Sequence, residues 1–403
     1  MSKLEQLLTE LCPDGVAFKT LGEISIITRG NGLSKSDFAE SGVPCIHYGQ
    51  IYTYYGTFAT KTKSFVTPEL AARLQTVSKG DIIIAVTSEN IEDVCKCVAW
   101  LGDEDIVTGG HTAIVKHKQN PMYIAYWLQT EAFFEQKRKI AHGTKVIEVT
   151  PKHLEGIKIP LPPLPVQSEI VRILDNFAEL TAELTAELTA RKKQYVYYRN
   201  SLLALPDAPR VAVGEMSLST STGVTPLAGN SEYYDGGEIP WLRTQEVRFV
   251  DIWETEMKVT EKALKETSLK WVPADCVIVA ISGATAGRVG INKIPLTTNQ
   301  HCCCFEIDKS KALYRYVFHC LSNANEDLLR LKQGARGDLN AGLIKRFAIP
   351  LPSLKEQARI VGILDKFDAL TTDITTGLPA EIEARQKQYE YYRDKLLTFK
   401  EVS

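Results

Sequence analysis

The chain has 403 residues, of which 44% are hydrophobic and 24% charged, and a formal net charge of −2 at pH 7. This length and composition are typical of a soluble protein with two globular domains. The near-neutral charge gives no overall field that attracts nucleic acid, so a nucleic-acid surface would need basic residues gathered on one face. No secretory leader and no run of about 18 apolar residues is found, which argues against secretion and membrane spanning.

Nine cysteines are present, including Cys95-Lys96-Cys97 and the run Cys302-Cys303-Cys304. They lack the paired C-x-x-C spacing of a zinc site, and adjacent residues on a strand point to opposite faces. We therefore expect no metal at these cysteines or at His301, and a core or strand role for them. Free thiols indicate a reducing, cytoplasmic location.

The first predicted element is a short helix in residues 1–20 that ends at Cys12-Pro13-Asp14-Gly15. The passage LCPDGVAFKTLGE (11–23) resembles LLALPDAPRVAVGE (202–215), because each runs through Pro-Asp to Gly-Glu. The N-terminal helix thus stands where the end of a later, longer helix would be. This predicts a circular arrangement in which the last helix, near Phe399, returns to the N-terminus.

Two globular units follow, residues 21–158 and 206–348, and both mix short apolar runs with charged helical segments, as compact mixed α/β domains do. They correspond weakly but in order. GVPCIHYGQIY (42–52) matches GEIPWLRTQEV (237–247), KGDIIIAVTSEN (79–90) matches PADCVIVAISGA (273–284), and VTGGHTAIV (107–115) matches TTNQHCCCF (297–305). A shared frame with different side chains is expected of two binding modules for different targets.

Each globular unit is followed by a repeated stretch, at 159–205 and 349–403. PLPPLPVQSEIVRILDNF (160–177) returns as PLPSLKEQARIVGILDKF (350–367), and RKKQYVYYRNSLL (191–203) returns as RQKQYEYYRDKLL (385–397). The offset grows from 190 to 194 residues, so the second copy is four residues longer in the middle. A period this long indicates a two-fold duplication rather than a stacked array.

Heptad spacing runs through the first repeat, at Ile170, Leu174, Phe177, Thr181, Leu184, Leu188, Arg191, Tyr195, Tyr198, Leu202 and Leu205. This predicts a helix of roughly 40 residues, about 60 Å long, that packs against another helix. In the second copy Gly377 and Pro379 should break or kink the helix. We expect the two long helices to form an antiparallel pair; the alternative is that each helix only covers its own neighbouring domain.

Catalytic motifs are missing. The sequence contains no GxxxxGK[ST] loop and no N/D-P-P-Y/F motif of an amino-methyltransferase. Asp251, Glu256 and Lys258 have the bare spacing of a nuclease cluster, but we interpret the surrounding segment as a solvated helix face.

Without catalytic motifs, the chemistry left for the sequence to indicate is binding. Arg, Lys, Asn and Gln side chains suit base edges, and any basic side chain suits phosphates. The loops after the matched strands and two glycine-flexed turns supply such groups. The candidates for DNA contact are Gln50, Tyr52, Ser88, Asn90, Lys145, Arg243, Gln245, Ser282, Arg288 and Arg336.

The whole arrangement resembles the specificity subunit of type I restriction-modification enzymes. The resemblance rests on the duplication and on the motif IPLPxLxxQxxIVxILD, present at 159–175 and 349–365. The TAEL tetrads at 181–188 resemble those of the IC subgroup.

The resemblance implies a non-catalytic DNA-specificity subunit of a bacterial, cytoplasmic complex. Residues 21–158 and 206–348 would be target-recognition domains that each read one half of a bipartite double-stranded site, and the helices would set the spacer. Two methyltransferase subunits that use S-adenosylmethionine would dock on the chain, and motor-nuclease subunits that use ATP and Mg would join them. No cofactor is expected on this chain. The repeated tyrosines Tyr195, Tyr198, Tyr389 and Tyr392 are candidates for the methyltransferase surface, or else pack in the helix seam.

Two alternatives remain open at this point. A helical scaffold with two interaction domains would bind no DNA. A self-sufficient nuclease or methyltransferase would act with metal or S-adenosylmethionine alone.

Overall fold

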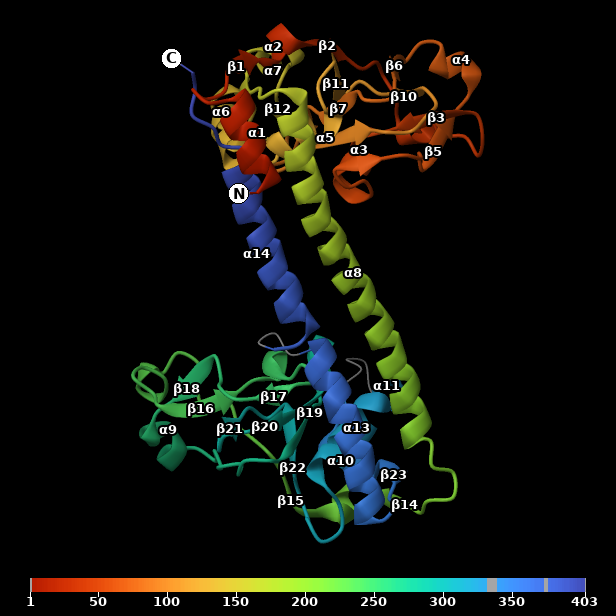
Figure 1. Cartoon of the computed structure of the whole chain (residues 1–403). Coiled ribbons are helices and arrows are strands. Elements are labelled where there is room, and N and C mark those ends of the chain that lie inside the picture. Colours follow the sequence, from red (N-terminus) through yellow and green to blue (C-terminus); the bar gives the residue numbers. More distant parts are fainter. Residues whose placement is uncertain (1, 332–338, 373–375, 403) are drawn as a thin grey trace. The chain divides into compact units, whose positions relative to one another are not determined.

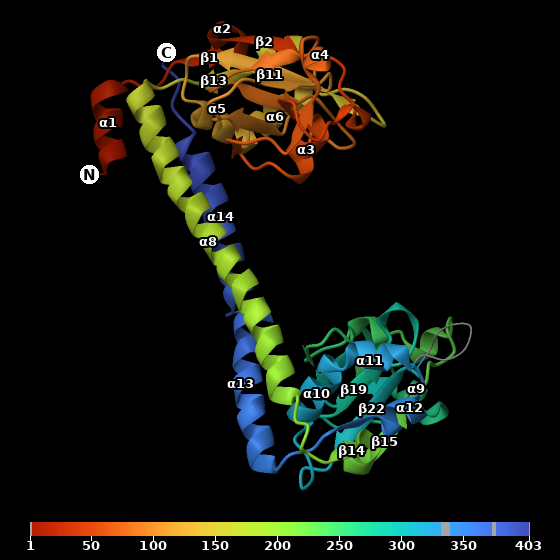
Figure 2. The same cartoon turned by 90° about the vertical axis from the view of Figure 1, so that its right-hand side faces the viewer.

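A computed structural model describes residues 2–331, 339–372 and 376–402. The chain forms two compact units: unit 1 comprises Met1–Thr185 with Ile382–Ser403, and unit 2 comprises Ala186–Glu381. Each unit is a mixed α/β domain with a stretch of long helix packed against it (Figures 1 and 2). The prediction of a mixed α/β fold with two domains and long packed helices is confirmed.

The central sheet of unit 1 has five strands. Their order is β2 (Ser25–Arg29), β11 (Thr112–His117), β7 (Ile82–Ala85), β9 (Cys97–Trp100) and β4 (Phe58–Ala59). Strand β7 is buried on both faces because its side chains alternate between two cores. Ile82 and Ile84 face the helices, whereas Ile83 and Ala85 face the second layer.

Smaller elements complete unit 1. The second sheet has the strand order β5 (Ser64–Val66), β3 (Val43–Ile46), β10 (Ile106–Thr108) and β6 (Gln75–Val77). Two further pairs of short strands are formed by β1 (Phe18–Thr20) with β13 (Lys158–Pro160) and by β8 (Thr87–Ser88) with β12 (Ile147–Glu148). The helices are α1 (Lys3–Leu11), α2 (Leu21–Ile24), α3 (Tyr48–Thr53), α4 (Pro68–Ala71), α5 (Pro121–Trp127), α6 (Glu131–Ile140) and α7 (Pro151–Glu155).

Unit 2 repeats this topology. Its central sheet has the order β15 (Ser217–Thr222), β22 (Cys302–Ile307), β19 (Val277–Ala280), β20 (Val289–Asn292) and β17 (Asp251–Ile252). The smaller sheets are β18 (Met257–Val259), β16 (Ile239–Leu242) and β21 (Thr297–Thr298), and β14 (Arg210–Ala212) with β23 (Ala348–Pro350). The helices are α9 (Glu261–Glu266), α10 (Tyr314–Asn323), α11 (Asn325–Arg330) and α12 (Ala341–Arg346). The shared frame of the two units is thus confirmed.

Backbone hydrogen bonds fix how the two units correspond. Val86 N–H donates to the His111 carbonyl, and Ile281 N–H donates to the His301 carbonyl, both over 2.9 Å. The match of His111 with His301 was therefore right, but the match of 79–90 with 273–284 was one residue out. Val86 corresponds to Ile281, where the apolar runs alone had aligned it with Ala280. The match of 42–52 with 237–247 was also one residue out, because Ile46 pairs with Thr108 and Leu242 pairs with Thr298.

Long helices form the rest of the described chain. Helix α8 runs unbroken for 40 residues, Leu164–Leu203, whereas the second copy is divided into α13 (Leu354–Thr372) and α14 (Leu378–Leu396). Pro379 is the second residue of α14, a position where its missing N–H is not needed. The predicted interruption near Gly377 and Pro379 is confirmed.

Aromatic stacking between the repeats shows the antiparallel pairing. In unit 1, Phe177 of α8 stacks on Tyr392 of α14 with ring centroids 5.4 Å apart. In unit 2, Phe367 of α13 stacks on Tyr198 of α8 at 5.6 Å. Each pair joins the start of one repeat to the end of the other, so the helices run antiparallel in both units.

The glutamine of the repeated IPLPxLxxQ motif makes the same buried hydrogen bonds in both units, which accounts for the repetition of the sequence at the helix start. Gln167 is fully buried; its Oε1 accepts from Asn120 N–H at 3.0 Å, and its Nε2 donates to the Pro162 carbonyl at 2.8 Å. Gln357 makes the equivalent bonds to Leu313 N–H and the Pro352 carbonyl. Each glutamine therefore joins a globular unit to its long helix, and we call this pair the glutamine latches.

The last residues of the described chain return to the segment that follows α1 in unit 1 (Figures 1 and 2). Val16 forms a parallel bridge with Glu401, and a Cβ on Gly15 would lie 2.6 Å from the Lys400 carbonyl oxygen. The last helix thus returns to the N-terminal segment, as predicted. Leu397, the residue after α14, occupies the core position that Leu203 of α8 takes in unit 2, so the end of α14 and not α1 stands there. Helix α1 is an addition beside it, held to α8 by a Lys3–Glu169 ion pair.

Candidate nucleic-acid interface

In unit 1, four of the candidate residues lie at or near the ends of β3 and β7. Ser88 is half-buried in β8, opposite Ile147, and Asn90 is exposed, with its amide bonded to Asp93. The Tyr52 hydroxyl donates to the Thr87 carbonyl at 2.8 Å, and burial raises the pKa of this tyrosine. Ser88 and Asn90 are therefore the more accessible members of this group.

Gln50, the fourth, has a structural role. It is buried, its Oε1 accepts from His47 N–H at 3.1 Å, and its Nε2 donates to Ser64 Oγ at 2.6 Å. The corresponding Glu246 accepts from Arg243 N–H at 3.1 Å. Both side chains cap the turn that follows a strand, so neither offers a free edge to a base.

Lys145 lies in the exposed turn after α6. Gly143 has φ of +117°, and a Cβ there would lie 1.9 Å from the Val146 carbonyl oxygen, so glycine is required for this turn. His142 and Glu148 close the loop through two backbone hydrogen bonds of 3.0 and 2.8 Å. The corresponding candidate of unit 2, Arg336, lies outside the described residues.

Arg243 of unit 2 is largely neutralised. Its Nη2 lies 2.8 Å from Glu256 Oε2, and the exposed amide of Gln245 can accept from the same guanidinium.

The segment around Glu256 does not have the predicted structure of a solvated helix face. Residues 253–259 form a loop and strand β18, not a helix face, and Asp251 and Glu256 are bound by different arginines.

Arg288 and Ser282 lie at the ends of β20 and β19, and both are half-buried. The structure adds a counterpart of Arg288 in unit 1. Ala85 N–H donates to the Lys96 carbonyl, and Ala280 N–H donates to the Arg288 carbonyl, both over 2.9 Å. Lys96 is exposed, and neither basic side chain forms an ion pair with any described residue.

Lys96 was missed because the segment from the paired alanine to the basic residue has a different length in each unit, Ala85 to Lys96 against Ala280 to Arg288, so no constant offset aligns the two. The backbone conformation of the preceding residue identifies Lys96 as the counterpart of Arg288: Cys95 has φ of +68° and Gly287 has φ of +86°.

His111 was matched to His301 but was not named as a candidate for DNA contact. It is exposed, bonded to Thr87 Oγ1 at 3.0 Å, and its ring centroid lies 4.8 Å from that of Tyr48. Both units thus carry a cation and a histidine at equivalent positions.

The four tyrosines proposed for partner binding lie in helix packing. Tyr392 and Tyr198 stack on phenylalanines, Tyr195 stacks on Phe367, and Tyr389 packs against Tyr126. The middle tyrosine of each segment is outward instead. Tyr197 is 69% exposed and Tyr391 is 61% exposed.

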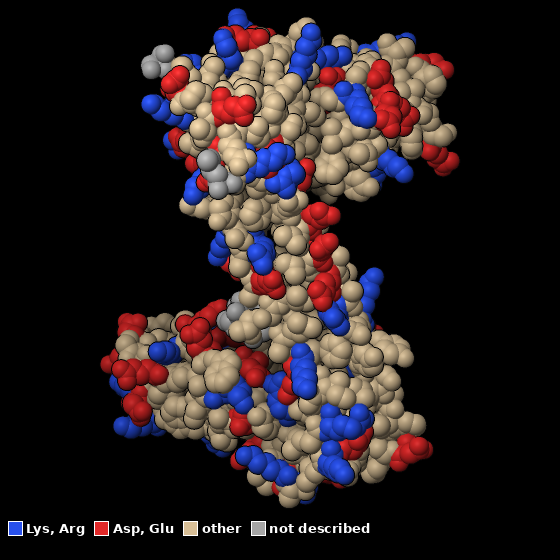
Figure 3. Space-filling model, in the orientation of Figure 1, with Lys and Arg blue, Asp and Glu red and all other residues tan. Residues whose placement is uncertain are grey.

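Charge on α8 further restricts where DNA can lie. Glu179, Glu183 and Glu187 are exposed at four-residue spacing, and acidic side chains follow this helix in Figure 3. Like charge repels phosphate, so this face of α8 is unsuited to DNA contact.

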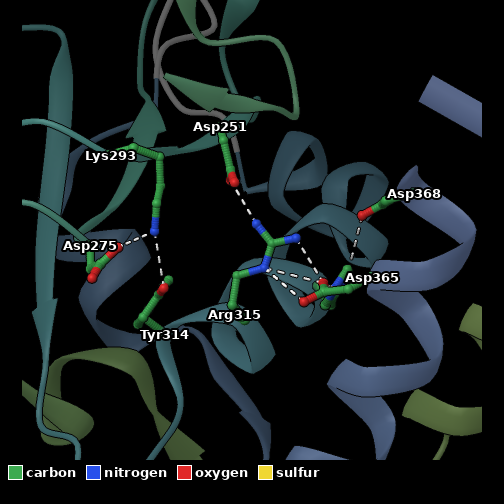
Figure 4. Close-up of polar contacts among 8 residues, drawn as sticks. Asp251, Asp275, Lys293, Tyr314, Arg315, Asp365 and Asp368 are labelled. Atoms are coloured by element: carbon green, nitrogen blue, oxygen red, sulfur yellow. Dashed lines mark hydrogen bonds and ion pairs between the residues drawn. The ribbon is translucent and has the colours of Figure 1, made fainter. Parts of the chain in front are cut away.

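An ion network occupies the junction of α10 with α13 in unit 2 (Figure 4). Arg315 donates to Asp365 at 2.7 Å and to Asp251 at 2.6 Å, and His319 Nε2 lies 2.7 Å from Asp365. Unit 1 has a simpler contact at this place, where the Tyr126 hydroxyl donates to Asp175 at 2.6 Å.

The thiols are structural. All nine cysteines are free, and Cys302, Cys303 and Cys304 lie buried in β22, as expected. Burial raises the pKa of Cys95, Cys97 and Cys303 to about 12, which keeps these thiols neutral and poor metal ligands. Among the described residues, no helix is both long enough and apolar enough to cross a membrane.

Comparison with known proteins agrees with this architecture. Residues 13–191 and 211–384 match the family described as type I restriction modification DNA specificity domain. The chain is 38% identical over 292 residues to the EcoR124I/EcoR124II specificity subunit of Escherichia coli, a match that covers 69% of this chain and 70% of that protein. It is 31% identical over 300 residues to a putative type I specificity subunit of Haemophilus influenzae, covering 72% and 75%.

Solved structures share the fold. A chain of a type I restriction-modification system solved for its complex assembly aligns with a TM-score of 0.65 at 17% identity, covering 96% of this chain and 98% of that one. The specificity subunit from Mycoplasma genitalium aligns at 0.56 and 15% identity, covering 95% and 96%.

The chain therefore belongs to the family of type I restriction-modification DNA-specificity subunits. It carries two target-recognition domains and is a non-catalytic specificity subunit, so the scaffold and enzyme alternatives are set aside.

Proposed function

We propose that each unit reads one half of a bipartite double-stranded DNA site, and that the long helices set the spacer between the halves. One observation carries this proposal: the two units share one backbone frame but present different side chains at equivalent strand ends. Tyr48 of unit 1 stands where Thr244 stands in unit 2, and Gly49 stands where Gln245 does, and all four residues are half-buried or exposed. A common frame with different exposed groups suits two targets of related shape and different sequence.

Positions at which the units agree have a different role in this proposal. Lys96 and Arg288 would contact phosphate, which every half-site offers, and His111 and His301 lie at a second shared position. Ser88, Asn90, Lys145, Gln245 and Ser282 remain the proposed sequence-reading or backbone contacts. Gln50 is left out because its amide is already bonded within the fold.

The proposed partners follow from the family. Two methyltransferase subunits would bind the helices and supply S-adenosylmethionine for adenine methylation, and motor-nuclease subunits would supply ATP- and Mg-dependent cleavage. We propose the outward Tyr197 and Tyr391 as part of the methyltransferase surface, in place of the packed tyrosines. The TAEL tetrads and the likeness to the EcoR124I subunit support an IC-type system.

A randomised-site DNA library tests this function. The chain alone and the chain co-expressed with its methyltransferase would each be incubated with the library, and bound and methylated sequences would be read. We expect a split motif that is methylated on adenine only by the complex. Methylation of a continuous motif, or of no preferred sequence, would contradict two-unit recognition.

A further inference from the structure

The α10–α13 junction of unit 2 contains more carboxylate than its bases can balance. Asp251, Asp365 and Asp368 surround the single guanidinium of Arg315. These groups are half-buried, with side-chain exposures from 20% to 35%. By their formal charges, these three carboxylates and one guanidinium leave two negative charges in excess, in an environment where uncompensated charge is unfavourable.

Hydrogen bonding fixes the orientation of His319. Asp365 accepts hydrogen bonds from the guanidinium of Arg315 through both of its oxygens. The imidazole Nε2, 2.7 Å from Asp365 Oδ1, is then the nitrogen that carries hydrogen. Its other nitrogen, Nδ1, is left with a free lone pair.

That lone pair faces another acceptor. His319 is fully buried, and its Nδ1 has no hydrogen-bond partner among the described residues. Its nearest charged neighbour is Asp368 Oδ2 at 3.9 Å, too far for a hydrogen bond. An unpartnered imidazole nitrogen and a carboxylate oxygen that face each other across this gap can share a cation.

We propose that His319 Nδ1 and Asp368 bind one divalent cation of the zinc class, with water completing the coordination. Imidazole and carboxylate are zinc ligands at about 2.0 to 2.2 Å, so an ion between the two atoms needs little movement of either. The bond from Nε2 to Asp365 matches the carboxylate–histidine pairing that orients metal-binding histidines. One divalent ion would also cancel the two excess charges.

The carboxylate side of the site has access to solvent. Asp368 lines two cavities of about 750 and 570 Å³ within unit 2, which supply room for the waters, whereas the buried His319 lines neither of them. Ser322 lines the larger cavity, and its buried hydroxyl also lacks a described partner, so it can bond to such a water. The ion would bridge α10 to α13 and reinforce the attachment made by the Gln357 latch.

Unit 1 provides a natural control. Tyr126 stands at the position of His319, and its hydroxyl is fully engaged by Asp175. Ala178 stands at the position of Asp368 in the repeat. We therefore expect one ion per chain, and none in unit 1.

The test uses the full chain, stripped with EDTA and titrated with Zn²⁺ by calorimetry, with elemental analysis after desalting. We expect one bound equivalent in the wild type and in Tyr126→Phe, and loss of that equivalent in Asp368→Asn and His319→Gln. Zn²⁺ should raise the Tm of the wild type and leave that of Asp368→Asn unchanged. Absence of bound zinc in the wild type, or undiminished binding in both variants, would overturn the site.

Cobalt separates this site from adventitious binding by cysteine. Co²⁺ held by nitrogen and oxygen shows weak visible bands, whereas thiolate ligands add intense near-ultraviolet charge-transfer bands. We expect the nitrogen–oxygen spectrum, and thiolate bands would refute the assignment. This wild-type spectrum decides the question even if both variants fail to fold.

Discussion

Lys96 and Arg288 lie at equivalent positions of the two units. We propose that both contact phosphate, although the residues around them differ. Each follows a residue with positive φ, and each pairs through its backbone with the last alanine of the adjacent strand. The two side chains differ in shape but agree in charge. Recognition of phosphate requires only that charge, whereas recognition of a base requires defined geometry.

We expect Lys96→Ala and Arg288→Ala to weaken DNA binding to a similar extent for all sequences. Each should reduce the slope of log affinity against log salt concentration by about 0.9, because one phosphate contact is lost. Fluorescence anisotropy with specific and unrelated duplexes, at several salt concentrations, measures both effects. The control is Lys118→Ala. Lys118 is an exposed lysine that follows the last residue of β11, at the end of the strand away from His111, and its loss should leave the slope unchanged.

If Lys96→Ala instead relaxed the sequence preference at one base while the salt slope stayed constant, Lys96 would be a base-reading residue. The assignment of shared positions to phosphate would then be wrong.

Glu169 contributes a pH-dependent term to the attachment of α1. Its carboxylate accepts from Arg172 at 2.6 Å and pairs with Lys3 at 3.0 Å, and chiefly the Arg172 hydrogen bond lowers its pKa from 4.5 to about 2. A lowered native pKa means that this stabilisation is complete above pH 4.5 and is lost as the pH falls toward 2.

Glu169→Gln should therefore lower the free energy of unfolding by about 1 kcal/mol at neutral pH, because its partners Lys3 and Arg172 are mostly exposed and such ion pairs contribute little. The difference from wild type should shrink below pH 4.5. Urea titrations at several pH values measure it, with Glu10→Gln on the exposed face of α1 as the control. A difference that grew on acidification would contradict this origin.

At the scale of elements, the glutamine latches connect sequence repetition to stability. Removal of Gln167 leaves the Asn120 N–H and the Pro162 carbonyl without their partner in a buried position. Each unsatisfied group costs about 1 to 3 kcal/mol.

Gln167→Ala and Gln357→Ala should each destabilise the unit that contains the substitution by about 2 to 4 kcal/mol. Limited proteolysis followed by mass spectrometry should find new cleavage in unit 1 for the first variant and in unit 2 for the second. Gln386→Ala, exposed on α14, is the matched control. Equal cleavage of both units by either variant would mean that the latches do not act locally.

The TAEL tetrads allow a test of the proposed spacer role. One added tetrad lengthens α8 by about 6 Å, close to two base-pair steps of about 3.4 Å. Insertion after Leu188 should therefore lengthen the spacer by about one or two base pairs and leave both half-sites unchanged. Methylation mapping of the insertion variant measures this. A changed half-site with the original spacer would exclude the helix as the determinant of spacing.

For the whole molecule, independence of the two units is the property to test. Replacing residues 21–158 with the equivalent segment of another family member should change one half-site completely and leave the other half and the spacer intact. Methylation mapping of the chimera shows the outcome directly. A change in both halves would contradict independent recognition.

Periodicity made much of this architecture predictable. The heptad positions from Ile170 to Leu188 are buried or half-buried in α8, and Pro379 identified the interruption of its partner. Both conclusions needed only spacing and the missing N–H of proline.

Side-chain roles were harder to predict, since they depend on register and on local hydrogen bonds. The different lengths of the segments from Ala85 to Lys96 and from Ala280 to Arg288 concealed Lys96. Gln50 was a candidate for DNA contact, although a Gln or Glu three residues beyond an N-cap position is also a capping signal. The heptad identified Tyr195 and Tyr198 as seam residues, but the seam and a partner surface remained equal alternatives until packing was visible.

The repetition of the segments that carry the glutamine latches has a genetic consequence. Residues 160–177 and 350–367 carry the same motif, with the glutamine at the same place in each. A crossover within such a segment replaces one globular unit and reconstitutes an intact latch at the junction. New DNA specificities can thus arise by exchange of whole recognition units, without any need to evolve a new attachment to the helix.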